Sequence, residues 1–489
     1  MQEKIEEARR EFNAILDYVL HGAMGREIHQ VEEGIYRMLL RLGRILLELF
    51  VLAMGTGKMG QTLVGSDGST YRYGGTSVRK YLSIFGEIAI LRAHYVRNGR
   101  SGLFPLDARL NLPERKYSYV LQEWMSSEAV ETSYEAASAR LNDRLGLQVA
   151  HRPVQRVVRD CAAAADEFME SLPAPPPEEE GSLLVHSVDC KGIPMRPANR
   201  NPAAVKAEDK PGEKKMACVA RAYSIDPHER DPEVIVESFL KQSKVSGDKD
   251  KESPRPKPCH RRTTASLKRS KSEVFDQSEA GIKTRVHKGT KEKVVLMDGE
   301  RALWRISGER FPDWTEILDF SHVMEKLRFA GDLHFGQGSQ DAEEYVRERA
   351  LLLLEGEIDV VIDDLLWSLV DGCLTKGKAA QLKSKVVGYF QNNRHRMTYG
   401  DYLAKGLPIA TGIVESTCKT LIQKRMEGSG MLWSPDGAEA VLKLRGIFLD
   451  DLWNRFWAFR AQREKKRLYA AYTRIRGSEP KTQQFKRAA

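Results

Sequence analysis

The sequence has few cysteines and no long apolar run, and each absence excludes a class of protein. Its six cysteines lie far apart and form no C-x-x-C pair, so we expect neither a zinc ribbon nor a disulfide framework. The most apolar stretch, residues 39–54, contains Arg41, Arg44 and Glu48 and is too charged to span a membrane. No secretory signal is visible. With reduced thiols, these features predict a cytoplasmic protein with no membrane partner.

Acidic residues are scarce in two segments of an otherwise balanced chain. Over all 489 residues, 77 Lys and Arg face 68 Asp and Glu, a net charge of +9. Residues 241–271 and residues 451–489 each hold 11 basic against 3 acidic residues. Two solvated basic segments are the simpler interpretation, but such segments also suit a polyanion held at particular places.

Composition and periodicity divide the chain into segments, and its length alone predicts about three domains. We expect the following order: N-terminal helices (1–54), a small β-rich segment (55–113), a helical region (114–170), a stiff Pro/Glu linker (171–181), an α/β part (182–323) with a basic insert (241–271), an all-α insertion (324–410), a second α/β part (411–450), and a basic C-terminal helix and tail (451–489). The Ser- and Pro-rich basic insert is expected to be poorly ordered. The wide apolar face of the first helices should pack within the chain or, alternatively, against a second subunit.

Residues 114–170 contain the outline of a helix-turn-helix. Thr132 with Glu135 fits a capping box, and the helix that starts there should end at Gly146. The next helix should turn Val154 and its apolar neighbours inward. Its outward side chains suit phosphates and base edges: His151, Arg152, Gln155, Arg156 and Arg159. An ordinary helical hairpin with a solvated basic face is the alternative interpretation.

Three acidic residues stand at the boundaries of apolar elements. Two buried strands are predicted to end in Asp189 and Asp298, and a later helix carries Glu415 near its start. Singly, each acid could shape a turn or favour a helix N-terminus. Together they could hold two divalent cations about 3.5–4 Å apart, the arrangement used for in-line phosphodiester chemistry. Basic residues follow Glu415: Lys419, Lys424 and Arg425.

Longer motifs surround these acids. They are Tyr81–Glu87, Leu103–Asp107, Leu112–Tyr119, Val188-Asp189-x-Lys191-Gly192, Met297–Glu300, Asp319-x-x-His322, Gly412–Lys419, Arg425-Met426 and Gly430-Met431-x-Trp433. In these motifs, from about Ser77 to Leu449, the chain resembles the transposases of bacterial insertion sequences of the Kra type. That family belongs to the Mutator-like branch of ribonuclease-H-fold DDE transposases. Cys190 departs from its pattern, because a glycine is usual at that position.

The resemblance implies a multidomain fold and a catalytic triad. The fold would place a helical, DNA-binding N-terminal region before a ribonuclease-H-like α/β domain with a mixed sheet, interrupted by an all-α insertion. Asp189, Asp298 and Glu415 would be the catalytic and metal-binding residues. The supporting residues would be Asp319, His322 and Lys419, and the DNA-binding residues would include Lys424 and Arg425 beside those of the helix-turn-helix.

The resemblance also implies a cofactor and partners. Two Mg²⁺ ions, replaceable by Mn²⁺, would serve both the cleavage of element ends and their joining to a target. The partner would be double-stranded DNA, bound by a homodimer or higher oligomer in a nucleoid-associated cytoplasmic location. Two alternatives remain open: a transposase-derived DNA-binding regulator without catalysis, and a ribonuclease-H-fold nuclease that cuts without joining.

Overall fold

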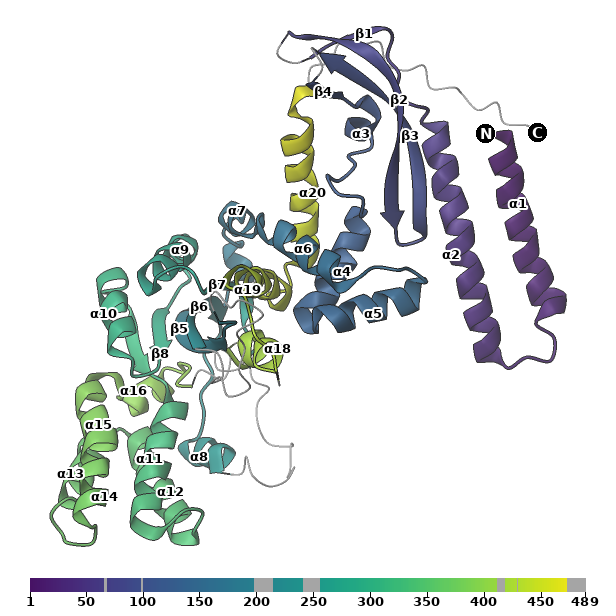
Figure 1. Ribbon diagram of the computed structural model, residues 1–489. Helices are drawn as coiled ribbons and strands as arrows, with labels where there is room; N and C mark the ends of the chain where they lie inside the picture. The colour runs from purple at the N-terminus through teal and green to yellow at the C-terminus, as the bar shows by residue number, and fades with distance from the viewer. Residues whose placement is uncertain are drawn as a thin grey trace. The chain divides into compact units, whose positions relative to one another are not determined.

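The computed structural model describes residues 1–65, 68–97, 100–197, 214–240, 256–410, 418–428 and 430–472 (Figure 1). The chain is mixed α/β and forms two compact units. Unit 1 comprises Met1–Phe168 and the segment that begins at Leu452, and unit 2 comprises Met169–Asp451. In the described ranges, no helix combines the length and the apolar composition that a bilayer crossing requires.

Unit 1 begins with two helices and a four-stranded antiparallel sheet. The two predicted helices are present as α1 (Gln2–Asp17) and α2 (Ile28–Ala53). The sheet has the order β1-β2-β3-β4 and is built from β1 (Thr62–Val64), β2 (Thr70–Ser83), β3 (Gly86–Arg97) and β4 (Arg100–Leu103). The short helix α3 (Pro105–Arg109) follows, and its Asp107 is buried between the guanidinium groups of Arg79 and Arg92.

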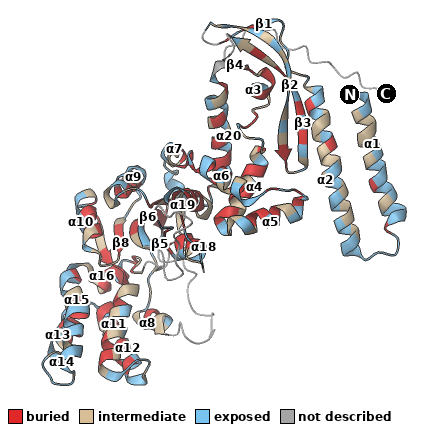
Figure 2. Ribbon diagram, in the orientation of Figure 1, coloured by how far each residue is buried: buried red, intermediate tan, exposed pale blue. Residues whose placement is uncertain are grey.

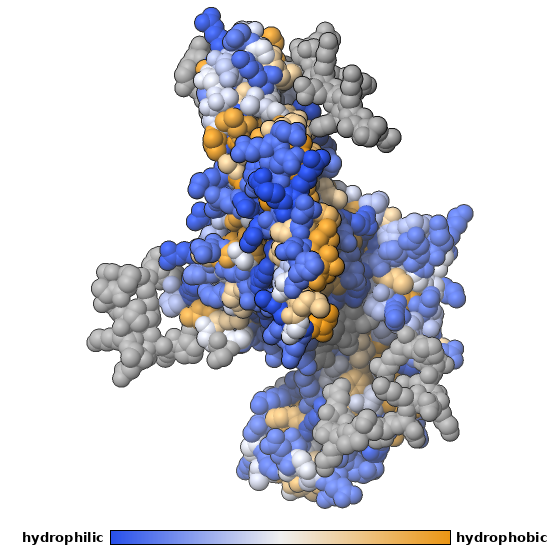
Figure 3. Space-filling view, turned by 90° about the vertical axis from the view of Figure 1, so that its right-hand side faces the viewer, coloured by the Kyte–Doolittle hydropathy of each residue, from blue (hydrophilic) through white to orange (hydrophobic). Residues whose placement is uncertain are grey.

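The apolar face of α1 and α2 is only partly covered. Ile45 and Val51 are buried, whereas Phe12, Leu20 and Phe50 are 51%, 62% and 51% exposed. Figure 3 views the molecule from the side on the right of Figure 1 and shows apolar patches among hydrophilic residues. The predicted packing within the chain therefore accounts for part of this face.

Three helices follow in unit 1, as the helix-turn-helix outline predicts: α4 (Tyr119–Glu131), α5 (Tyr134–Leu145) and α6 (His151–Ala162). Gly146 ends α5 in the left-handed conformation at φ 64°. The predicted capping box is wrong by one residue, because the Ser133 hydroxyl caps α5 by accepting from the Ala136 N–H (3.1 Å). Thr132 instead donates its hydroxyl to the Glu128 carbonyl at the end of α4 (3.0 Å).

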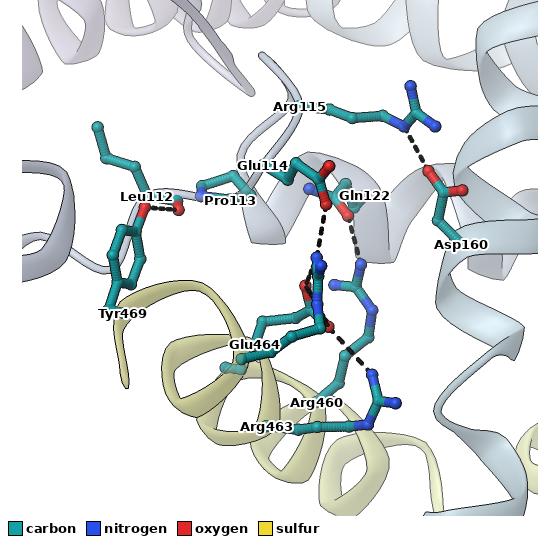
Figure 4. A network of polar contacts seen from close by, with 12 residues as sticks. Leu112, Pro113, Glu114, Arg115, Gln122, Asp160, Arg460, Arg463, Glu464 and Tyr469 are labelled. Atoms are coloured by element: carbon teal, nitrogen blue, oxygen red, sulfur yellow. Dashed lines mark hydrogen bonds and ion pairs between the residues drawn. The ribbon is translucent and has the colours of Figure 1, made fainter. Parts of the chain in front are cut away.

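The C-terminal helix α20 (Trp453–Tyr469) belongs to unit 1 and uses much of its charge internally. Arg460 donates to the Gln122 side chain (2.8 Å), and Tyr469 donates to the Leu112 carbonyl (2.5 Å) (Figure 4). Arg467 forms ion pairs with Glu114 and Glu464, both at 2.6 Å. These guanidinium groups therefore hold unit 1 together, and the predicted basic segment is not uniformly available to a polyanion.

Unit 2 is organised around a five-stranded mixed sheet of order β7-β6-β5-β8-β9. The strands are β5 (Leu183–Pro194), β6 (Lys214–Ile225), β7 (Cys259–Ser266), β8 (Glu292–Met297) and β9 (Thr315–Leu318). Strand β5 is antiparallel to β6, which is antiparallel to β7, whereas β5, β8 and β9 run parallel. Strand β5 does not end at Asp189 as predicted, because β6 pairs with it as far as Pro194.

Helices cover this sheet, and an all-helical segment follows its last strand. The segment after β9 consists of α11 (Phe320–Phe335), α12 (Gln340–Glu355), α13 (Ile358–Trp367), α14 (Lys376–Leu382), α15 (Gly388–Asn393) and α16 (Tyr399–Ala404). The other helices of unit 2 include α8 (Pro232–Leu240), α9 (Lys271–Lys283), α10 (Arg301–Arg310), α18 (Lys424–Met426) and α19 (Pro435–Leu449). One buried core joins the sheet to the helical segment (Figure 2).

The basic insert is partly structured, which corrects the expectation of poor order. Residues 241–255 lie outside the described ranges, but β7 forms the edge of the sheet within the predicted insert. Several of its basic side chains have internal partners: Arg261 pairs with Asp451, Lys268 with Asp436 and Lys271 with Glu300. The β-branched pair Thr263 and Thr264 was a weak signal for a strand, and the surrounding positive charge obscured it.

The predicted linker ends in a structural anchor. The side chain of Glu180 is 2% exposed and forms a two-pronged ion pair with Arg285, whose Nε and Nη2 lie 2.7 and 2.6 Å from its oxygens. Ser224 also donates its hydroxyl to this carboxylate. Although burial acts to raise it, the pKa of Glu180 is lowered by the hydrogen bonds from Arg285 and Ser224. The linker is thus fixed to the sheet at its C-terminal end.

Candidate active site

The parallel pairing of β5 with β8 brings two predicted catalytic acids side by side. Each β5 residue pairs with the β8 residue 109 positions later, up to His186 with Val295. Three residues further, the same offset relates Asp189 to Asp298, which follows the end of β8 and lies beyond the last paired positions. Neighbouring parallel strands are about 4.8 Å apart, so continuing this register brings the two acids toward the same edge of the sheet. Two carboxylates near each other at such an edge could share a divalent cation.

Strand β9 adds a third acid at the same level. Met297 pairs with Leu318, so Asp319 follows beside Asp298, and its N–H donates to the Met297 carbonyl (2.8 Å). Asp319 is 1% exposed and caps the N-terminus of α11 by accepting from the Ser321 N–H (2.9 Å). Its buried, capping position agrees with a supporting role and leaves Asp189 and Asp298 as the more accessible pair.

The electrostatic environment of Asp298 includes the charge of Asp189. Burial raises the pKa of Asp298, and the charge of Asp189 acts in the same direction. The N–H of Glu300 donates to Asp298 Oδ1 (3.0 Å) and opposes this shift. Trp304 holds the same turn by donating its indole N–H to the Asp298 carbonyl (2.6 Å). The Asp298 carboxylate is therefore held in a fixed turn at a buried position where the charge of Asp189 reaches it.

His322 lies one turn into α11 and interacts with these acids. Its Nε2 is 4.0 Å from the Asp319 carboxylate, and its Nδ1 is 3.1 Å from Glu325. Burial alone would lower the pKa of His322, but the charges of Asp319, Glu325 and Asp298 outweigh it and raise the pKa. The imidazolium is thus favoured beside the acids, where it can offset part of their negative charge.

Three cysteines lie near the strand position of Asp189, and one of them contacts its side chain. Cys190 pairs with Cys218 across β5 and β6, and the two thiols are hydrogen-bonded. The Cys418 thiol is hydrogen-bonded to Asp189, and burial followed by the charge of Asp189 raises its pKa. All three are free thiols. Cys190, the departure from the family pattern, therefore lies opposite a second thiol on the neighbouring strand.

Glu415 lies outside the described residues, as do all positions from 411 to 417. The described chain resumes at Cys418, which contacts Asp189. Within the described ranges, no group of three or more His, Cys, Asp and Glu side chains is arranged to hold a metal ion. The acid pair Asp189 and Asp298 still fits a divalent cation chemically, because such an ion would offset the repulsion that helps to raise the pKa of Asp298.

The predicted basic residues after Glu415 differ in accessibility. Lys419 and Lys424 are exposed. Arg425 is 2% exposed, and its guanidinium stacks on the Trp433 ring with its central carbon 4.8 Å from the ring centroid. Its burial gives no support to the predicted contact with DNA, which stays a prediction. The sequence did not indicate that Arg425 would stack on Trp433, which lies eight residues further along the chain.

In unit 1, α6 buries its apolar face and exposes most of its basic face, as the sequence predicts. Val154, Val157 and Val158 are fully buried. Four of the five predicted DNA-binding residues are exposed, namely His151, Arg152, Arg156 and Arg159. The fifth, Gln155, is half-buried. The burial pattern is also that of an ordinary amphipathic helix, so the DNA-binding role of α6 stays a prediction.

Sequence reasoning missed the aromatic and basic surroundings of Asp298. A Cβ atom at Gly299 would lie 2.2 Å from Tyr389 Cε2, so the turn after Asp298 must be glycine for Tyr389 to pack there. Burial and then the charges of Asp298 and Asp319 raise the pKa of Tyr389. The signal in the sequence was Gly299 itself, which we interpreted only as part of a turn.

Comparisons with known proteins add little to this geometry. No family model and no curated protein matches the sequence. Among solved structures, a chain of the Drosophila P element transposase strand transfer complex matches over 70% of this chain and 81% of its own length. Its sequence identity is 9% and the TM-score is 0.26, a value at which the match carries no argument.

Proposed function

We propose that this chain is a metal-dependent DNA transposase that cuts element ends and joins them to target DNA. The observation that carries the proposal is the parallel register of β5 and β8, whose continuation relates Asp189 to Asp298, together with the raised pKa of Asp298 that burial and the charge of Asp189 cause. The mixed sheet followed by an all-helical segment supports the ribonuclease-H-like assignment. Asp319 and His322 lie beside the pair, as a supporting signature requires.

Glu415 is proposed as the third ligand. It precedes Cys418 by three positions in the sequence, and three extended residues span at most about 11 Å; the Cys418 thiol contacts Asp189. The proposed triad would supply oxygen ligands, which Mg²⁺ prefers. Two bound Mg²⁺ ions would activate the attacking oxygen and stabilise the leaving oxygen.

The same site would serve both reactions. In cleavage, a water oxygen attacks the phosphorus and the 3′-oxygen of the element end leaves. In joining, that 3′-hydroxyl attacks a target phosphorus and the target 3′-oxygen leaves. Since both are displacements at phosphorus, the carboxylates act as ligands and no covalent protein intermediate is needed. Basic side chains hold the backbone phosphates.

Recognition of the element end is assigned to α6, and Arg156→Ala tests it. Arg156 is exposed, so its loss should leave the fold intact and weaken binding to end DNA by about 1–3 kcal/mol if it contacts a base edge. Fluorescence anisotropy with end DNA and scrambled DNA measures the effect. The control is Lys80→Ala, whose side chain is 75% exposed on β2. Equal affinity of Arg156→Ala and wild type would remove α6 from recognition.

A further inference from the structure

Unit 2 contains a basic cavity that adjoins the acid pair and that the proposed catalytic residues do not use. The basic cavity has a volume of about 1060 Å³ and is bounded by α10, α11 and residues 383–396. Its basic lining residues are Arg301, Arg305, Lys326, Lys383, Lys385 and Arg396. None of the described residues that line it is acidic.

The positive charge of the basic cavity is largely uncompensated. Arg396 pairs with Glu316 (2.6 Å) and lies over the Trp304 ring, 4.2 Å from its centroid. By contrast, Arg301, Arg305 and Lys383 have no carboxylate partner in the part of the chain that the structure describes. Like charges gathered without counter-charges repel one another, and an anionic ligand relieves that repulsion.

Two cavity lysines are positioned by aromatic rings. Lys326 Nζ lies 5.0 Å from the centroid of the Tyr389 ring, and Lys385 Nζ lies 4.8 Å from that of Phe329. Such cation–π contacts hold an ammonium group without neutralising its charge. The two ammonium groups are therefore held in position while keeping the positive charge that an anionic ligand would bind.

The basic cavity is lined by the residue that follows Asp298 in the chain. This residue is Gly299, and Tyr389 packs against it. Trp304 forms another connection, since its indole N–H donates to the Asp298 carbonyl while its ring carries Arg396. A strand whose phosphates lay in the basic cavity would continue past the acid pair.

Resting on the proposed function, we propose that the basic cavity binds the phosphate backbone of the DNA strand next to the scissile bond. Small-molecule pockets are mostly apolar with a few polar groups, whereas this lining is dominated by cations. Extended polyanions are instead held by several separate Lys and Arg side chains.

The test neutralises three exposed cavity residues together: Arg305→Gln, Lys383→Gln and Lys385→Gln. A matched control neutralises three exposed lysines outside the basic cavity: Lys288→Gln, Lys291→Gln and Lys376→Gln. Binding of labelled double-stranded DNA to the full chain is measured in EDTA over a range of salt concentrations. Without divalent ions, the result does not depend on whether the chain is a metal-dependent enzyme.

The cavity variant should bind DNA roughly tenfold to 100-fold more weakly than wild type, with a salt slope smaller by about 2–3. The control should change both values much less. Equal effects of the two variants, or no effect of either, would overturn the proposal. A cavity that serves a free nucleotide would also overturn it: ATP binding would then be lost in the cavity variant while DNA binding stayed intact.

Discussion

The Asp298→Asn variant should lose metal-dependent cleavage of element-end DNA by roughly 10³-fold, because a shared divalent ion supplies several kcal/mol of charge stabilisation. Asn keeps the shape of the side chain but removes the charge that Asp298 places beside Asp189. Cleavage of labelled end DNA with Mg²⁺ measures the loss, and a second gel scores joined products. The control is Asp313→Asn, an exposed acid between α10 and β9.

A stability measurement separates this loss from misfolding. Because the pKa of Asp298 is raised in the folded chain, the stabilising protonated form is lost as pH rises through that pKa. At neutral pH the metal-free fold thus carries a repulsive pair, and Asp298→Asn should melt at the same or a higher temperature in EDTA. Added Mg²⁺ should raise the melting temperature of wild type but not of the variant.

The products decide between the transposase and its alternatives. Equal cleavage by wild type and Asp298→Asn would refute the catalytic assignment. DNA binding without any cleavage by wild type would favour a regulator. Cleavage without joined products would favour a nuclease.

The Glu180→Gln variant should destabilise unit 2 by about 3–5 kcal/mol, because it leaves the buried Arg285 guanidinium without its counter-charge. The amide cannot replace the charged hydrogen bonds to Nε and Nη2. Urea denaturation followed by circular dichroism measures the change. The control is Glu179→Gln, whose side chain is 58% exposed and should cost less than about 1 kcal/mol.

Acid should remove the difference between wild type and Glu180→Gln. The pKa of Glu180 is lowered in the folded chain, so its contribution is present at neutral pH and lost as pH falls through that lowered value. Stabilities measured between pH 7 and pH 3 should therefore converge at the acid end. A difference below about 1 kcal/mol at pH 7 would mean that the ion pair does not anchor the linker.

Local sequence patterns predicted the elements that depend on local chemistry. The strand at β8, the helix end at Gly146 and the inward valines of α6 follow from periodicity and from glycine conformation, which neighbouring residues specify. The sequence predicted that Asp189 and Asp298 converge, but it did not predict the register of β5 and β8. The register itself depends on which strands align, and this is decided by the whole sheet.

Features that depend on distant residues could not be predicted. Arg425 was interpreted as a DNA contact because its burial depends on Trp433 and on packing around it. Glu180 was assigned to a spacer because its partner Arg285 lies 105 residues away. In each case a charged residue typical of the surface is compensated by a partner that periodicity does not reveal.

The most direct test of the shared cation site is anomalous diffraction from crystals of the full chain soaked in Mn²⁺. We predict an anomalous peak within coordination distance, about 2.0–2.3 Å, of carboxylate oxygens of both Asp189 and Asp298, absent from crystals of Asp298→Asn. Asp189 and Asp298 carboxylates too far apart to share an ion, or Mn²⁺ bound only elsewhere in the chain, would contradict the proposed active site.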